Sequence, residues 1–276
     1  MSVTIVPIPT AATSVHLSFF RVLRSEQIKF FTLRSTWWTL GAMTLACIGV
    51  GTLMPLFLAS GKSLDASQTG ELKGVIIANL IAMATTQLGL LFMVALAVLV
   101  ITNEYSSGMI RSTLVAVPRR LPVLATKTVL ISLVSFLVTM VIVVISAFLT
   151  LAVLNSDGLD ANFNDPAAWR MLLSAPLFVT GLALIGLGIG FMVRSTAAGI
   201  TAAFALIYVV PIVLQLFTAL GGSELLLALL PSEAGAQLSA INPAGLGGYW
   251  GSLAILFGWA AASLIGGGFL LKKRDA

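Results

Sequence analysis

The stretch that decides the fold is "LGLLFMVALAVLVITNEYSSGMIRSTLVAVPRR", residues 88–120, together with the run "VLISLVSFLVTMVIVVISAFLTLAVL" at 129–154. Residues 88–100 are apolar, residues 101–120 carry Glu104, Arg111, Arg119 and Arg120, and apolar residues then return. Apolar blocks of roughly 18 or more residues are typical of transmembrane helices. The pattern therefore predicts two membrane spans joined by a charged loop.

The composition extends this prediction to the whole chain. Of its 276 residues 58% are hydrophobic and only 9% are charged, whereas about 25% of the residues in a soluble domain are charged. Lipid offers no partners for backbone N–H and C=O groups, so we expect an all-α integral membrane protein. A segment 1–36 precedes a single domain, 37–276, with six expected spans near residues 37–59, 75–101, 123–154, 172–193, 197–220 and 250–271.

The basic residues predict the orientation of these spans. If both termini face the cytoplasm, most of the fifteen lysines and arginines lie in inner segments. The exceptions are Lys62, Lys73 and Arg170. An excess of Lys and Arg marks cytoplasmic segments. We therefore expect both termini, and the loop at 102–122, on the inner face. Topology and anionic lipid account for the basic pI without nucleic acid.

The segment before the first span, "HLSFFRVLRSEQIKFFTLR" at 16–34, has the pattern of an interfacial helix. Its narrow polar stripe consists of Ser18, Arg21, Ser25, Lys29 and Thr32, with Arg24 and Arg34 at the margins and phenylalanines over much of the rest. Such a helix lies in the membrane surface with its apolar face down. It is either an anchor for the first span or a lever that a cytoplasmic partner pushes, and the sequence favours the anchor.

Motifs for enzyme chemistry or nucleotide binding are not supported. The "SGKS" at 60–63 has Leu56 where a phosphate loop needs glycine, and "GLGIG" at 186–190 lies within a span. Gly186 and Gly190 instead form a Gly-x-x-x-Gly pair for close helix packing, within one subunit or in a dimer. His16 is alone, and there is no metal-ligand cluster or catalytic signature, so we expect neither a metal site nor an enzyme.

Neutral polar residues within the spans have two possible roles. They bond neighbouring helices, or they line a path for an amphipathic substrate. The candidates for such a path are Asn79, Thr86, Gln87, Tyr208 and Gln215.

The charged loop predicts a short amphipathic helix from about Ser107 to Val117, closed by Pro118. Tyr105, Met109 and Leu114 share an apolar aspect, while the arginines stay in water. Such a helix suits docking into a groove of a partner protein. The alternative is that it only connects the two spans. We expect Glu104 to be partly buried and bonded to backbone N–H groups or to an arginine.

The stretch "ITNEYSSGMIRSTLVAVPRRLPVLATK" at 101–127 resembles the inner-loop signature of ABC type-2 transporter permeases, the membrane subunits of ATP-driven exporters, and actinobacterial members in particular. The stretches "LRSEQIKFFTLRSTWWTL" at 23–40 and "LLKKRDA" at 270–276 resemble the same family. The resemblance implies two associated six-span subunits, as a homodimer or a heterodimer, in the bacterial plasma membrane. It also implies a separate ATPase subunit that holds ATP and Mg, and an outer re-entrant hairpin at 221–248. Without the resemblance, 221–248 would be only an extracellular loop.

The resemblance further implies that the inner loop and the interfacial helix couple ATP hydrolysis to transport. The implied coupling residues are Glu104, Tyr105, Met109, Arg111, Leu114, Arg119 and Arg120, with Arg21, Arg24, Lys29 and Arg34 on the interfacial helix. The neutral spans favour export of a hydrophobic or amphipathic compound, such as a drug, a peptide antibiotic or a lipid. The alternatives are a non-transporting scaffold or signalling partner of an ATPase and, third, a membrane enzyme.

The orientation predicts a labelling pattern in intact cells. With the single cysteine, Cys47, replaced by alanine, a cysteine introduced at Ser67 or Asp160 should react with an impermeant thiol reagent. One introduced at Ser106 should react only after the cells are permeabilised. Labelling of the Ser106 position in intact cells would show that the predicted orientation is wrong.

Overall fold

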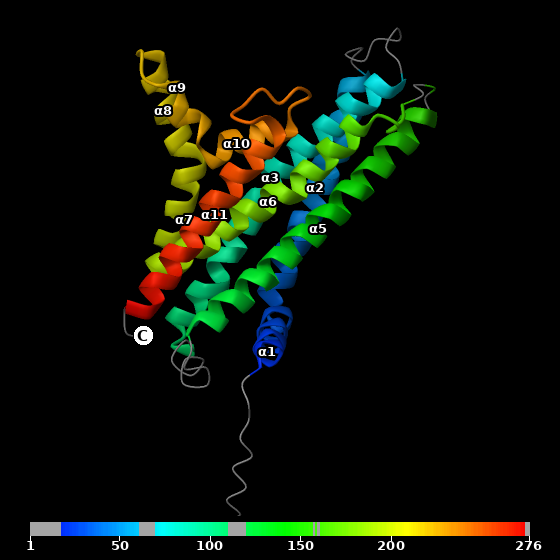
Figure 1. Ribbon diagram of the computed structural model, residues 1–276. Coiled ribbons are helices and arrows are strands. Elements are labelled where there is room, and N and C mark those ends of the chain that lie inside the picture. Colours follow the sequence, from blue (N-terminus) through cyan, green and yellow to red (C-terminus); the bar gives the residue numbers. More distant parts are fainter. Residues whose placement is uncertain (1–17, 61–69, 110–119, 157, 159–160, 274–276) are drawn as a thin grey trace, which may run out of the picture.

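The computed structural model describes residues 18–60, 70–109, 120–156, 158 and 161–273 (Figure 1). Every regular element in these residues is a helix. They are α1 (Phe19–Thr32), α2 (Arg34–Ser60), α3 (Gly70–Ser106), α5 (Arg120–Ser156), α6 (Pro166–Val193), α7 (Thr196–Phe204), the π-helical turn η1 (Ala205–Val209), α8 (Val210–Ala219), α9 (Glu224–Ala228), α10 (Pro231–Ser239) and α11 (Gly248–Lys273).

Six of these segments are long and apolar enough to cross a membrane, and each coincides with an expected span. They are α2, α3, α5, α6, the continuous run of α7, η1 and α8, and α11. The chain is therefore an all-α, multi-pass membrane protein, as predicted. The boundaries differ at the charged loop, because α3 continues to Ser106 and α5 begins at Arg120. Most of the helix expected at 107–117 lies outside the described residues.

Helix α6 forms the core of the bundle, packed against α3, α5 and α11. Every residue from Phe178 to Phe191 is buried. A helix that is apolar on all sides is stable only when other helices surround it. A polar contact within this apolar bundle joins Ser135 of α5 to Thr180 of α6, with 3.2 Å between the hydroxyl oxygens.

Glycines on α6 allow this close packing. A side chain added at Gly186 would meet Val94 of α3, and one added at Gly190 would meet Ile101 and Val98 of the same helix. The Gly-x-x-x-Gly pair therefore serves packing within one subunit. Gly188 performs the same role toward α11, where the backbone of Ser263 approaches it.

Helix α1 lies across the end of the bundle, seen nearly end-on in Figure 1 while the long helices are seen from the side. Leu33 alone, with extended backbone angles, separates it from α2. Phe20 and Phe31 of α1 are exposed, as expected for a helix whose apolar side chains face lipid. The C-terminal end of α11 lies at this same end of the bundle.

The segment between the fifth and sixth spans folds back into the bundle at the opposite end from α1 (Figure 1). Helix α10 packs on α6 and α11 and buries Ala234 and Leu238. Asn79 of α3 donates a hydrogen bond of 2.5 Å to the carbonyl oxygen of Ser239. Arg170 at the start of α6 donates to the carbonyl oxygen of Ile241 at 2.6 Å. The segment expected as a re-entrant hairpin, 221–248, thus contains α9 (Glu224–Ala228) and α10, and side chains of α3 and α6 bond its backbone.

The close contact at Gly188 predicts a position-specific loss of stability. In Gly188→Ala the new Cβ would lie 2.5 Å from the carbonyl carbon of Ser263, so a backbone has to shift. Overpacking of this kind costs about 1–3 kcal/mol. The measurement is the thermal unfolding midpoint in detergent, which should fall. Gly258→Ala is the control, because nothing lies within 4 Å of its added Cβ. Equal midpoints for the two variants would contradict the packing described here.

Candidate functional site

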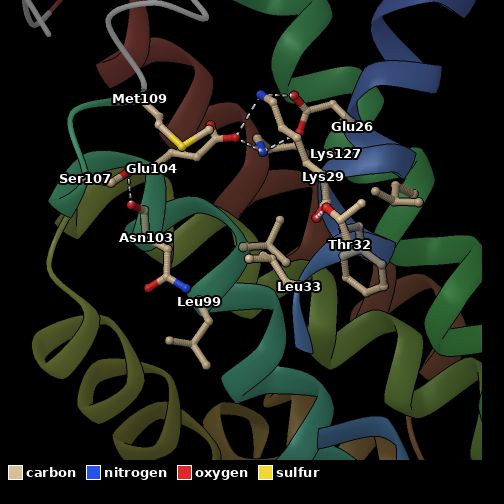
Figure 2. Close-up of a pocket in the computed structure, with 13 residues that line it drawn as sticks. Glu26, Lys29, Thr32, Leu33, Leu99, Asn103, Glu104, Ser107, Met109 and Lys127 are labelled. Atoms are coloured by element: carbon tan, nitrogen blue, oxygen red, sulfur yellow. Dashed lines mark hydrogen bonds and ion pairs between the residues drawn. The ribbon is translucent and has the colours of Figure 1, made fainter. Parts of the chain in front are cut away.

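A cluster of four charged side chains joins α1, α3 and α5. We call Glu26, Lys29, Glu104 and Lys127 the four-charge cluster (Figure 2). The Lys127 Nζ lies 2.5 Å from Glu26 Oε2 and 2.9 Å from Glu104 Oε1. The Lys29 Nζ lies 2.9 Å from Glu26 Oε1 and 3.2 Å from Glu104 Oε1. Each ammonium group thus bridges both carboxylates.

Helix geometry places these four residues together. On α1, Val22, Glu26 and Phe30 are spaced four residues apart, so they form one row, and all three are buried. Helix α1 packs against α5, where Lys127 lies in the second turn. Glu104 lies in the last turn of α3. The cluster therefore fastens the crosswise helix to the two long helices at the ends that flank residues 107–119.

The cluster is buried and electrically neutral overall. Lys127 is 1% exposed, Glu26 2% and Glu104 6%, while the Lys29 side chain is 32% exposed. Burial alone would raise the pKa of the Glu26 carboxyl, but Lys127 and Lys29 together hold that pKa below its usual 4.5. Burial would lower the pKa of Lys29, but Glu26 and Glu104 raise it above its usual 10.5. Both groups are therefore charged at neutral pH.

One oxygen of the cluster has no partner among the described residues. Glu104 Oε1 accepts from both lysines, whereas its buried Oε2 accepts no hydrogen bond. Beside it lies a cavity of ≈ 300 Å³, which we call the cluster cavity (Figure 2). Helices α1, α3 and α5 form its walls. Leu33, which follows α1, and Ser107 and Met109, which follow α3, complete them.

Part of this site differs from the sequence prediction. Glu104 is buried and bonded as expected, but its partners are two lysines and not an arginine or backbone N–H groups. Glu26 and Lys127 were not predicted as site residues. Each left a signal in the sequence, since Glu26 interrupts the apolar row of Val22 and Phe30, and Lys127 lies within an apolar stretch that requires a partner for it.

The other predicted coupling residues fall into three groups. Arg21, Arg24 and Arg34 are exposed, as is Met109 at 46%. Tyr105 lies under the guanidinium of Arg194, with 5.0 Å between Cζ and the ring centroid. Arg120 is the first residue of α5, and Arg111, Leu114 and Arg119 lie outside the described residues. A coupling role for these residues stays a prediction.

A second cavity lies near the opposite end of the bundle, between α3, α6, η1 and α10. This α10 cavity of ≈ 360 Å³ brings together four of the five residues proposed for a substrate path, Asn79, Thr86, Gln87 and Tyr208. Asn79 also bonds α10, and the Thr86 hydroxyl bonds the carbonyl oxygen of Met83, so both have packing roles as well. Gln215 is exposed on α8 and does not line this cavity.

The described residues contain no group of three His, Cys, Asp or Glu side chains that could hold a metal ion. Neither a protein-family model nor a curated protein matches this sequence.

The cluster predicts that charge balance matters more than any single charge. Lys127→Met leaves two buried carboxylates with only the partly exposed Lys29, and loss of one buried partner costs about 3–5 kcal/mol. Adding Glu26→Gln restores neutrality, so the double variant should recover most of the loss. The measurement is the denaturant or thermal unfolding of all four members of the mutant cycle.

Lys272→Met removes an exposed lysine and is the matched control, with an expected change within about 0.5 kcal/mol. Additive losses in the double variant would show that the two residues do not act as a pair.

Proposed function

We propose that this protein is the transmembrane subunit of an ATP-driven exporter of the ABC type-2 class, in the bacterial plasma membrane with both termini in the cytoplasm. It acts with a second permease subunit and with a separate ATPase that binds ATP and Mg. The support is the sequence resemblance together with one observation, the four-charge cluster. That cluster fastens an interfacial helix to the ends of α3 and α5, between which the predicted coupling segment runs.

The cluster suits the transmission of force. A push on residues 107–119 acts on the ends of α3 and α5, and the ion pairs make α1 move with them because separating buried opposite charges is costly. A movement of a docked ATPase would in this way reach two spans and the membrane surface together. If α1 were held only by apolar contacts with lipid, it could slide in the membrane plane without moving α3.

The α10 cavity supports the proposed substrate class. Its walls combine neutral hydrogen-bonding groups at Asn79, Gln87 and Tyr208 with the apolar Phe178 and Ile207. None of the described residues that line it is charged. A hydrophobic or amphipathic molecule, such as a drug, a peptide antibiotic or a lipid, satisfies both kinds of wall, whereas a strongly charged solute would lose its hydration without compensation.

The test compares two variants in one assay of export and ATPase association. Met109→Asp with Leu114→Asp should weaken ATPase binding or abolish export at normal expression, because charge replaces the apolar docking surface. Gln87→Leu should leave ATPase association unchanged and reduce export of hydrogen-bonding substrates by roughly tenfold, as expected for one lost polar contact.

The matched control is Gln215→Leu, because Gln215 lies outside the α10 cavity. Export and ATPase binding at wild-type levels in the Met109/Leu114 variant would reduce the segment to a connector. An ATPase that binds while no candidate compound is exported would favour the alternative, a scaffold or signalling partner.

A further inference from the structure

A groove lies between the start of α5 and the end of α11, and we call it the α5–α11 groove. Its volume is ≈ 350 Å³, which lies within the roughly 300–1,000 Å³ of small-molecule sites. Leu121 and Leu124 belong to its α5 wall, and Ile265 and Phe269 belong to its α11 wall. Among the described residues that line it, Lys272 alone is charged.

Two adjacent glycines of α11 explain why the groove exists. Gly267 is used for packing, because a Cβ added there would lie 2.8 Å from the Cβ of Phe191 in α6. A Cβ added at Gly268 would meet only the ends of two α5 side chains, Leu124 at 3.5 Å and Leu121 at 3.7 Å. The missing side chain of Gly268 therefore leaves space between α5 and α11.

The groove has a cationic end and an apolar end. Ile265, Gly268 and Lys272 are three or four residues apart, so they lie along one face of α11. Lys272 is in the last turn of α11, which lies at the same end of the bundle as α1 (Figure 1). A lysine at the end of a span reaches the headgroup region of a bilayer. Ile265 lies about two turns farther into the span and is 71% exposed.

The charges at this end favour an anionic occupant. Lys272 and Lys273 are both exposed, and the Lys273 Nζ lies 6.0 Å from the ring centroid of Phe269, which lines the groove. The two carboxylates described at this end, Glu26 and Glu104, are buried in the four-charge cluster. Since no exposed carboxylate is described at this end, a second copy of the chain would bring further positive charge and no counter-ion.

We propose that the α5–α11 groove binds an anionic phospholipid from the leaflet on the α1 side. The phosphate lies beside the ammonium groups of Lys272 and Lys273, and an acyl chain lies over Gly268 along Leu124 and Ile265. A choline or ethanolamine headgroup neutralises its own phosphate, so it gains less from the two lysines. The bound lipid contacts α5 and α11 together, and this role does not depend on whether the protein transports a substrate.

The test is native mass spectrometry of the purified full-length protein with phosphatidylglycerol and phosphatidylcholine of identical acyl chains. At equal amounts of the two lipids, the wild-type protein should retain phosphatidylglycerol at least about tenfold more than phosphatidylcholine. Lys272→Gln should lower this preference about fivefold, because it removes one of the two cations. In detergent without lipid the same variant should unfold at the wild-type midpoint, since Lys272 is exposed.

Matched variants separate the groove from the rest of the membrane surface. Gly268→Leu should lower retention of phosphatidylglycerol at least about tenfold, because the new side chain fills the groove from a position where a Cβ is tolerated. Gly258→Leu introduces the same side chain into open space on the same helix and should retain the lipid as the wild type does. Arg24→Gln removes an exposed cation of α1 outside the groove and should keep the preference.

Three outcomes would overturn the proposal. One is equal retention of the two lipids by the wild-type protein, or an undiminished preference in both Lys272→Gln and Gly268→Leu. Another is displacement of phosphatidylglycerol by an equal concentration of soluble glycerol phosphate, which would mean that the lysines bind a free phosphate and not a lipid. The third is a dimer of the wild-type protein that dissociates in Gly268→Leu, which would assign the groove to a second copy of the chain.

Discussion

The need to pair charges that are removed from water organises one end of this protein. Glu26, Glu104 and Lys127 are almost completely buried, and none of them could remain so alone, because an isolated buried charge costs several kcal/mol. Their mutual bonds fix the distance between a helix in the membrane surface and two helices that cross it. At the opposite end of the bundle, the side chains of Asn79 and Arg170 bond backbone carbonyl oxygens at and after the end of α10.

The core and the two cavities follow from a different requirement, close helix packing. The glycines of α6 let α3 and α11 approach until backbones nearly touch, as Gly188 and Ser263 do. Helix α10 returns to the bundle at one end and α1 crosses it at the other, and a cavity lies beside each.

The sequence predicts the fold class well because hydropathy and membrane chemistry leave few choices. The block from Val129 to Leu154 is too long and too apolar to be anything but a span, and each of the six spans is confirmed as a helix. The ends of the spans are harder to predict. The expected second span ends at residue 101, where the apolar residues stop, but α3 continues through Asn103 and Glu104.

The site was only half predicted. Glu104 was recognised because a carboxylate at the end of a span requires a partner. Its partners were not, because Lys29 and Lys127 lie 75 and 23 residues away along the chain, and Glu26 is separated from Lys127 by 101. Which residues meet depends on how α1 crosses the bundle, and no local pattern in the sequence encodes that angle. The residues of the α10 cavity were found more easily, because polar side chains are rare within apolar spans.

The central claim is that the four-charge cluster makes α1 and α5 move as one body. It is tested most directly by the distance between spin labels on α1 and α5, placed at the exposed positions Ile28 and Leu133 in a chain lacking Cys47. The account predicts one narrow distance distribution in the wild-type background and a broad one in Lys127→Met. It also predicts that the narrow distribution returns when all four charges are reversed together, with Glu26→Lys, Lys29→Glu, Glu104→Lys and Lys127→Glu, because every contact then again joins opposite charges. The same distribution in all three proteins would contradict it, because apolar contacts alone would then hold the helix in place.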